Sequence, residues 1–405
     1  KTSIGVDLRS YTGYHYRVLN NLMGLDGYYS TGNRNSAGQI IETTVNASPF
    51  NNTGLNGPKI DYYNVGKVGW QGLNTMVEYG GDRLTAVVQA GLSNQAFQRI
   101  DYFDQVGNPE SEVQNQGGGY IKGGANYNID EKQNLFFNTG FISRQPQFGA
   151  VFPNFANDIN PDLQNEEIRS FELGYGFIGR DFSFNVNAYS TTWGNRFVTR
   201  SLSNQQGVDG SAQFRNIDVR HNGIEFEGKY NVTESTKITG MLSVGDWRYT
   251  KDFTAELFDD NQQSIGTGTL YLEGSKVGDA AQFTSNIGID QRLGNKLSVD
   301  LNYRFVDGLY ADYSITDSEF TNPDNAGALK LPSYGLVDFG ITGRLGKGWV
   351  IRGNINNLLN TTYIAESNSN IHADENSTTW NGVDVRNSVW FGFGRTWNAS
   401  LTYNF

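Results

Sequence analysis

The chain is poor in the residues that build disulfide frameworks and metal sites. It has no cysteine, 8 prolines, 3 methionines and 3 histidines in 405 residues. Without cysteine there is no disulfide framework and no thiolate site. The histidines, His15, His221 and His372, are scattered and lack metal-ligand spacing. The residues therefore indicate no metal and no cofactor, and no catalytic set of nucleophile, base and orienting group that would indicate an enzyme.

Long hydrophobic runs and excess positive charge are also lacking. No stretch approaches the roughly 18 apolar residues that a membrane-spanning helix needs. Only 37% of the residues are hydrophobic, which is low for a chain that must bury a large core. The net charge of −11 argues against nucleic acid as a partner.

Aromatic residues, glycine and strict alternation are what the chain has instead. It contains 25 Phe, 22 Tyr, 7 Trp and 49 Gly. At its end, Trp397, Ala399, Leu401, Tyr403 and Phe405 fall on one face of a strand, with polar residues between them. This pattern is typical of a strand that has one apolar and one polar face.

Similar alternation recurs along the whole chain. It predicts fourteen strands, at 3–13, 66–79, 84–103, 118–129, 134–145, 168–178, 182–198, 213–232, 237–253, 279–293, 297–313, 332–345, 349–364 and 388–405. Many of these segments are longer than strands of globular proteins usually are. They are long enough to cross a bilayer at a tilt, which takes about 9–11 residues.

Short turns and long polar loops alternate between the predicted strands. The short turns are Gly80–Arg83, Asp130–Gln133, Gly179–Asp181, Thr233–Thr236, Gly294–Lys296 and Gly346–Gly348. The long loops are 14–65, 104–117, 146–167, 199–212, 254–278, 314–331 and 365–387. Strict alternation places all tight turns at one end of the sheet and all long loops at the other. The predicted fold is therefore all-β, a transmembrane antiparallel β-barrel with lipid on one face and water on the other.

Several stretches resemble the barrel of TonB-dependent outer-membrane receptors. "NEEIRSFELGYGF" (Asn165–Phe177) resembles the family's Glu-x-Ser-x-Glu-x-Gly strand, and "NIDVRHNGIEFEGKY" (Asn216–Tyr230) resembles its x-Gly-x-Glu-x-Glu strand. "INNLLNTTY" (Ile355–Tyr363) is similar to its Asn-Leu-Phe-Asp-x-x-Tyr motif, with Leu359 and Asn360 in place of Phe and Asp. The opening stretch, 3–24, resembles receptors of Bacteroidota.

The resemblance implies a larger protein and a transport function. The family's barrel is plugged and has about twenty-two strands, so we expect this chain to be the C-terminal part, without the plug and the early strands. Receptors of the family import a bulky nutrient across the bacterial outer membrane with energy from the TonB system. Both ends of this segment would then lie in the periplasm. The expected partners are the bilayer, the barrel-assembly machinery, TonB through the plug, an unidentified nutrient and a surface lipoprotein at loops 14–65 and 254–278.

Two groups of residues are candidates for function. The terminal strand, with Trp397, Leu401, Tyr403 and Phe405, resembles the family's signal for barrel assembly. The loop with His372, Asp374, Glu375 and Trp380 could contact a ligand or partner at the mouth of the barrel, although its polar sequence favours a solvated loop. The Glu225 and Glu227 pair points to one side of a strand, where we expect lumen charges that contact Arg, Lys or a plug.

The sequence is also compatible with two other functions. The first is a self-closed fourteen-stranded passive pore or hydrophobic-solute channel, in which strand 3–13 pairs with strand 388–405. The second is a structural or adhesive surface component of an envelope complex, whose loops contact other proteins.

Overall fold

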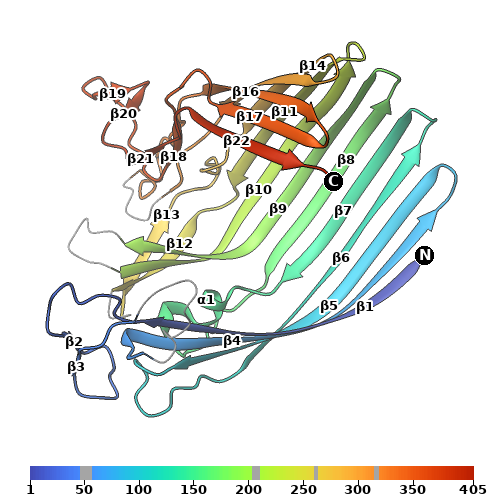
Figure 1. Ribbon diagram of the computed structural model, residues 1–405. Coiled ribbons are helices and arrows are strands. Elements are labelled where there is room, and N and C mark those ends of the chain that lie inside the picture. Colours follow the sequence, from blue (N-terminus) through green and yellow to red (C-terminus); the bar gives the residue numbers. More distant parts are fainter. Residues whose placement is uncertain (46–56, 203–209, 260–262, 314–318) are drawn as a thin grey trace.

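The computed structural model describes residues 1–45, 57–202, 210–259, 263–313 and 319–405. Its main feature is one curved antiparallel sheet of 16 strands (Figure 1). Fourteen strands follow one another in spatial and chain order: β1 (Thr2–Arg17), β4 (Ile60–Gly80), β5 (Leu84–Asp101), β6 (Gln114–Asn128), β7 (Gln133–Arg144), β8 (Glu166–Ile178), β9 (Phe182–Leu202), β10 (Gly210–Asn231), β11 (Thr236–Tyr249), β14 (Phe283–Leu293), β15 (Leu297–Asp307), β16 (Tyr334–Gly346), β17 (Trp349–Asn356) and β22 (Thr396–Tyr403).

These fourteen strands confirm the fourteen predicted from alternation, in the same order. The observed ends of some strands differ from the predicted ends where the adjoining loops are rich in apolar residues. The predicted strands 297–313, 349–364 and 388–405 are too long, because the structure ends β15 at Asp307 and β17 at Asn356 and begins β22 at Thr396. Apolar residues beyond these points pack into the loops instead of continuing the sheet.

The tight turns all lie at one end of the sheet and the long connections at the other (Figure 1). Both ends of the chain lie beside the turns. The amino group of Lys1 donates to the carbonyl of Glu78 at 2.6 Å, and the amide of Asn404 donates to the carbonyl of Gly348 at 2.9 Å. The β16–β17 turn shows why glycine is needed there, since Gly346 and Gly348 have φ of 84° and 81°.

The outward face of the sheet is apolar across all fourteen strands. Residues paired in register share a face, so Val6, Leu73 and Leu92 form one row, and Ile224 and Val244 belong to another. Leu301 and Leu401 face the same way, and 43% and 61% of their surfaces are exposed. Phe184 and Phe226 also point outward and stack on each other at 5.9 Å. No second layer covers this face in the described part of the chain.

The inward face carries the polar residues, as predicted. Asn185, Glu227 and Asn302 alternate with outward-facing neighbours and point to the concave side. At the turn end, outward aromatic side chains form a belt that includes Tyr79, Tyr127, Tyr175, Tyr230, Trp349 and Tyr403. Such a belt is typical of the level where a barrel leaves the hydrocarbon of a membrane.

The long connections contain more structure than the predicted polar loops. They hold the helix α1 (Phe148–Val151), the 3₁₀ turn η2 (Pro153–Phe155) and eight strands: β2 (Tyr28–Ser30), β3 (Gln39–Ile41), β12 (Phe253–Asp259), β13 (Ser264–Leu270), β18 (Ile364–Ser367), β19 (Thr379–Trp380), β20 (Val383–Asp384) and β21 (Val389–Phe391). The hairpin β12–β13 extends the sheet, because β12 pairs with the loop-side end of β10. Parts of the predicted loops 14–65, 199–212, 254–278 and 314–331 lie outside the described residues.

The two edges of the main sheet are not paired with each other. Within the described ranges, β1 pairs with β4 and β22 pairs with β17, and no pairing joins β1 to β22. The sheet is therefore an open trough in Figure 1. Among the same residues, no helix has the length and apolar character to cross a membrane.

Candidate functional site at the loop end

Three buried apolar clusters give the loop end a defined shape. The largest lies between β10, the β12–β13 hairpin and the β15–β16 connection, and its fully buried side chains include Phe214, Phe253, Leu270 and Phe320. The other two are centred on Leu331 and Ile364, and on Phe97 and Val151. The connections are therefore packed against one another, and they present a preformed surface.

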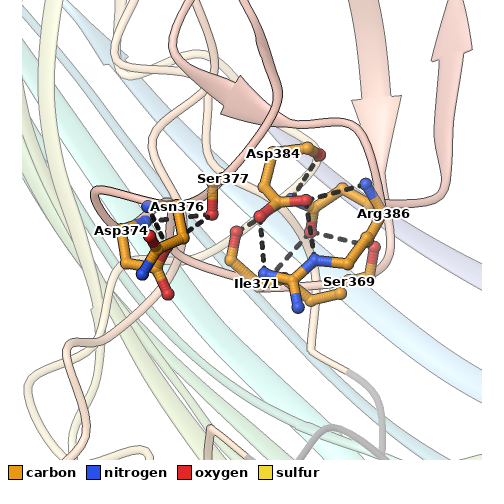
Figure 2. A network of polar contacts seen from close by, with 8 residues as sticks. Ser369, Ile371, Asp374, Asn376, Ser377, Asp384 and Arg386 are labelled. Atoms are coloured by element: carbon orange, nitrogen blue, oxygen red, sulfur yellow. Dashed lines mark hydrogen bonds and ion pairs between the residues drawn. The ribbon is translucent and has the colours of Figure 1, made fainter.

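The connection between β17 and β22 is held by a network of buried polar groups (Figure 2). Asn387 accepts hydrogen bonds from the amide of Ile371 and the hydroxyl of Ser369, and it donates to the carbonyls of Ile371 and Asp384. Asn370 joins this loop to its neighbour by donating to the carbonyl of Asp312 and accepting from the amide of Leu329. Buried polar groups that are satisfied in this way fix a single loop conformation.

An ion pair closes the same network. Arg386 donates to both carboxylate oxygens of Asp384, at 2.9 and 2.6 Å, and the Asp384 side chain is almost fully buried. The guanidinium of Arg386, aided by Ser377 and the Arg386 amide, holds the pKa of the Asp384 carboxyl well below its usual range. Asp384 is therefore ionised at any physiological pH and acts as a structural anchor of the loop.

The four predicted loop residues have different surroundings. The ring of His372 contacts the carbonyl of Gly327 at 3.0 Å, and Trp380 packs edge-on against Phe391 at 5.2 Å. The Asp374 carboxylate accepts from the Asn376 amide and the Ser377 hydroxyl of its own turn. Glu375 is exposed. The structure thus places these residues in one connection, where His372, Asp374 and Trp380 make contacts within the protein. A ligand role for them stays a prediction.

The "INNLLNTTY" motif ties the end of β17 to the start of β22. Asn357 is buried, with φ of 50°, and its side-chain amide donates to the carbonyls of Thr361 and Phe393 while its carbonyl accepts from the Thr361 amide. Asn360, with φ of 55°, accepts from the Arg395 amide. Asparagine tolerates this left-handed backbone better than most residues, which explains why the motif uses it.

A group of carboxylates from three connections was not predicted from the sequence. Asp279, Asp312 and Glu366 lie near one another, and Arg200 of β9 pairs with Asp312 at 2.5 Å. Partial burial, together with the charges of Asp312 and Glu366, raises the pKa of Asp279 to about 6. The three residues lie far apart along the chain, so the sequence contains no spacing from which to predict their proximity.

The inner wall carries carboxylates without cationic partners. The Glu172 side chain accepts from Asn187 and Asn138 at 3.0 and 3.1 Å, and Glu225 accepts from Asn187 at 3.3 Å. In the described part of the chain, no Arg or Lys forms an ion pair with Glu172, Glu225 or Glu227. The expected contact of the Glu225 and Glu227 pair with neighbouring Arg or Lys is therefore wrong for these residues, because Asn185 and Asn187 of β9 and Met241 and Ser243 of β11 lie opposite them. The expected contact with a plug stays a prediction.

Three residues of the predicted assembly signal lie on the last strand, and Phe405 lies two residues beyond its end. Trp397, Leu401 and Tyr403 point outward from β22, and Tyr403 packs against Trp349 at 4.7 Å and against Phe405 at 5.5 Å. Their proposed role in assembly stays a prediction. Across the described residues, no group of three His, Asp or Glu side chains is arranged to hold a metal ion.

The geometry defines a class of protein: a barrel wall with an apolar outer face, a polar inner face and packed loops at one end. The sequence matches the family described as TonB dependent receptor-like, beta-barrel, over residues 2–358. The chain belongs to this family, whose barrels lie in the outer membrane. No curated protein matches the sequence at a significant level.

Solved structures of similar fold include proteins named as transporters and import receptors. The copper transporter OprC matches 100% of this chain and 54% of its own, with 12% identity and a TM-score of 0.64. The ferric-catecholate import receptor Fiu from E. coli K12 matches 100% of this chain and 52% of its own, with 14% identity and a TM-score of 0.62. The ferric citrate transporter FecA matches 99% and 51%, with 13% identity and a TM-score of 0.62. At such identities the likeness shows the fold alone, and the chain spans about half the length of these structures.

Proposed function

We propose that this chain forms barrel wall and loops of an outer-membrane receptor that imports a bulky nutrient with energy from the TonB system. The observation that carries the proposal is the division of all fourteen strands into an apolar outer and a polar inner face, with packed loops at one end. A wall of this kind encloses a water-filled path through a bilayer, and its loop end offers a preformed surface to a ligand. The loops then face the cell exterior and both chain ends face the periplasm.

The unpaired edges support a barrel with further strands. An open sheet edge in hydrocarbon leaves backbone groups without hydrogen bonds, each at a cost of several kcal/mol. We therefore propose that strands from elsewhere in the protein pair with β1 and β22 and complete the wall. The self-closed fourteen-stranded pore predicts direct pairing of β1 with β22, and the described residues do not show it.

The inner carboxylates support a plug inside the barrel. Glu172 and Glu225 lie on adjacent inward rows and share the amide of Asn187. Carboxylates without a cation partner in a confined lumen favour a basic partner, because an Arg can bind a carboxylate with two hydrogen bonds. We propose that a cationic segment of the plug contacts this part of the wall.

Other partners follow from exposed apolar side chains. Tyr29 and Ile40 of the β2–β3 hairpin are 64% and 65% exposed, and Ile265 of β13 is 46% exposed. Both hairpins lie in the connections expected to meet a surface lipoprotein, as in Bacteroidota receptors, and the resemblance of residues 3–24 supports that type. We propose that the outward aromatic residues of β22 are recognised by the barrel-assembly machinery.

Uptake in cells tests the proposal. Cells that produce the intact protein, and cells that lack it, would be given labelled iron chelates first, because two of the similar structures carry names of iron-chelate import proteins, and then cobalamin, glycans and peptides. We expect uptake of one nutrient that requires the protein and stops when TonB is deleted. Uptake that persists without TonB would favour the passive pore, and an absence of uptake across these nutrients would favour a structural role.

A further inference from the structure

A row of cations crosses the outward face of the sheet toward its loop end. In register, Arg169 of β8 lies opposite Thr192 of β9, Thr192 opposite Arg220 of β10, and Arg220 opposite Arg248 of β11. An isolated bridge then joins Arg248 to Lys276. Residues paired across strands share a face, so all five side chains start from one line on the outside of the wall. This line, with its four cations, is called the cationic row below.

The cationic row has too few negative partners on the protein. Arg169 pairs with Glu167 at 2.8 Å, while Arg248 and Lys276 share Asp246 at 2.8 and 2.5 Å. No hydrogen bond or ion pair reaches the side chain of Arg220 from the described residues, and Asp218, two residues away along β10, already pairs with Lys251 at 2.8 Å. Four cations thus face two carboxylates in a chain whose net charge is −11.

Two arginines of the cationic row lie directly opposite each other, which further favours an anion from outside the protein. Like charges in a cross-strand pair destabilise a sheet. Arg220 and Arg248 form such a pair, and both are exposed. An anion from outside the protein would bridge them and remove the repulsion, since guanidinium groups bind phosphate with paired hydrogen bonds.

The height of the cationic row fits the headgroups of a membrane. Below Arg220, Asn222 is polar and Ile224 is the first apolar residue of the outward face, four residues away. Four residues of a strand tilted by about 45° rise about 10 Å. This places the guanidinium groups of Arg220 and Arg248 at the level where lipid phosphates lie, because the headgroup region adds roughly 5–8 Å to each side of the hydrocarbon and arginine side chains bend toward it.

An apolar groove opens on the same face next to the cationic row. It has a volume of about 410 Å³, and its lining includes Val88, Ile121, Gly123, Thr139, Phe141 and Phe171, with Arg169 at its upper end. Gly123 has no side chain and that of Thr139 is small, so the floor of the groove is low between the larger apolar side chains. The Arg169 guanidinium lies 5.7 Å from the centre of the Phe141 ring, so charge and apolar surface meet there.

We propose that the cationic row and the groove together bind an anionic membrane lipid, with its headgroup phosphate on the arginines and an acyl chain in the groove. The inference goes beyond nutrient import and rests on the proposed placement of the wall in a membrane. Charge complementarity and the adjacent groove favour a lipid over an acidic protein, which would have no use for a narrow apolar channel on the lipid face.

The test compares lipids retained by the intact protein in nanodiscs made of equal parts phosphatidylcholine and phosphatidylglycerol. Native mass spectrometry then counts the lipids that stay bound to the protein after its release from the nanodisc. We expect selective retention of phosphatidylglycerol, and a loss of about fivefold for each charge removed in Arg220→Gln and Arg248→Gln, since each cation near an anionic surface contributes about 1 kcal/mol. Val88→Phe, which fills the groove without changing charge, should also reduce retention.

The controls separate lipid binding from folding and from transport. Arg220→Lys with Arg248→Lys should restore most of the retention, and Arg180→Gln, at an exposed turn on the opposite end of the wall, should leave it unchanged. Equal retention of both lipids, an equal loss in Arg180→Gln, or an acidic protein bound in place of lipid would overturn the proposal. Nutrient uptake is measured for the same variants, so that failure of lipid binding is distinguished from failure of the transport function.

Discussion

Large apolar side chains are exposed on the outer face of the wall and buried in the clusters of the loop end. In the wall, Ile224 and Leu401 are 57% and 61% exposed, whereas in the loop end Phe214 and Phe320 are completely buried. The difference reflects the solvent that each region meets. Hydrocarbon accepts apolar side chains on the surface of the wall, while water drives those of the loops into packed clusters. A large exposed apolar surface is therefore a functional feature of the wall, and it would be an aggregation site in the loops.

The largest expected effect comes from emptying a loop cluster. Phe214→Ala removes a completely buried ring that packs edge-on against Tyr313 at 5.7 Å. Substitutions of this kind cost about 3–5 kcal/mol. We expect faster hydrogen exchange and proteolysis across β12, β13 and the β15–β16 connection, with the wall unchanged. Phe393→Ala, at a loop ring that is 85% exposed, is the matched control and should have little effect; equal effects of the two variants would remove the distinction between the regions.

A charge on the outer face of the wall should have the next largest effect. Leu301→Arg places a cation among apolar side chains that face lipid, at a cost of about 2–4 kcal/mol near the middle of the bilayer. Asn302→Arg, one residue further along β15, points into the lumen beside Asp338 and should cost far less. Urea unfolding of both variants in lipid vesicles measures the difference. If Asn302→Arg proves the more destabilising, the assignment of the two faces is reversed.

Removing the asparagine that joins β17 to β22 should have a smaller effect. Asn357→Ala leaves the partly buried carbonyls of Thr361 and Phe393 and the Thr361 amide without these partners. Unsatisfied buried groups cost about 1–3 kcal/mol, and since these groups are only partly buried we expect a cost at the lower end of that range. We expect increased exchange at the Thr361 amide, which loses its side-chain acceptor, and Asn356→Ala serves as the control. Unchanged exchange would mean that the motif has no role in holding this corner.

The smallest effect should come from the titration of Asp279. Its pKa of about 6 in the folded protein lies above its usual value of 3.8, so the folded state binds the proton more tightly. Stability of the loop end should therefore fall as pH rises from about 4 to about 6, by less than about 1 kcal/mol because the carboxyl stays in contact with solvent. Exchange of the amides in 309–313 and 319–331 would show this slope, and Asp279→Asn should abolish it. A slope that survives in Asp279→Asn would assign it to another group.

Alternation and turn residues were enough to predict the wall. Fourteen segments with period-two patterns were found in the correct order, and the assignment of Leu301 outward and Asn302 inward follows from the same period. Each of these signals is local, because a strand with one wet and one oily face must alternate wherever it lies. The motif at Asn357 could be recognised in the sequence, but the hydrogen bonds of Asn357 to Thr361 and Phe393 could not be predicted from it.

The sequence by itself determined the number of wall strands, their faces and the end at which the loops gather. The tertiary structure alone decided which distant residues meet: the hairpin β12–β13 that extends β10, the carboxylates Asp279 and Asp312 beside Arg200, and the register that aligns Arg220 with Arg248. The face on which a residue lies and the length of a strand depend on neighbours a few residues apart in the sequence. The contacts between distant residues depend on the register in which each strand pairs with the next. A shift of two residues preserves every face but moves one arginine away from the other.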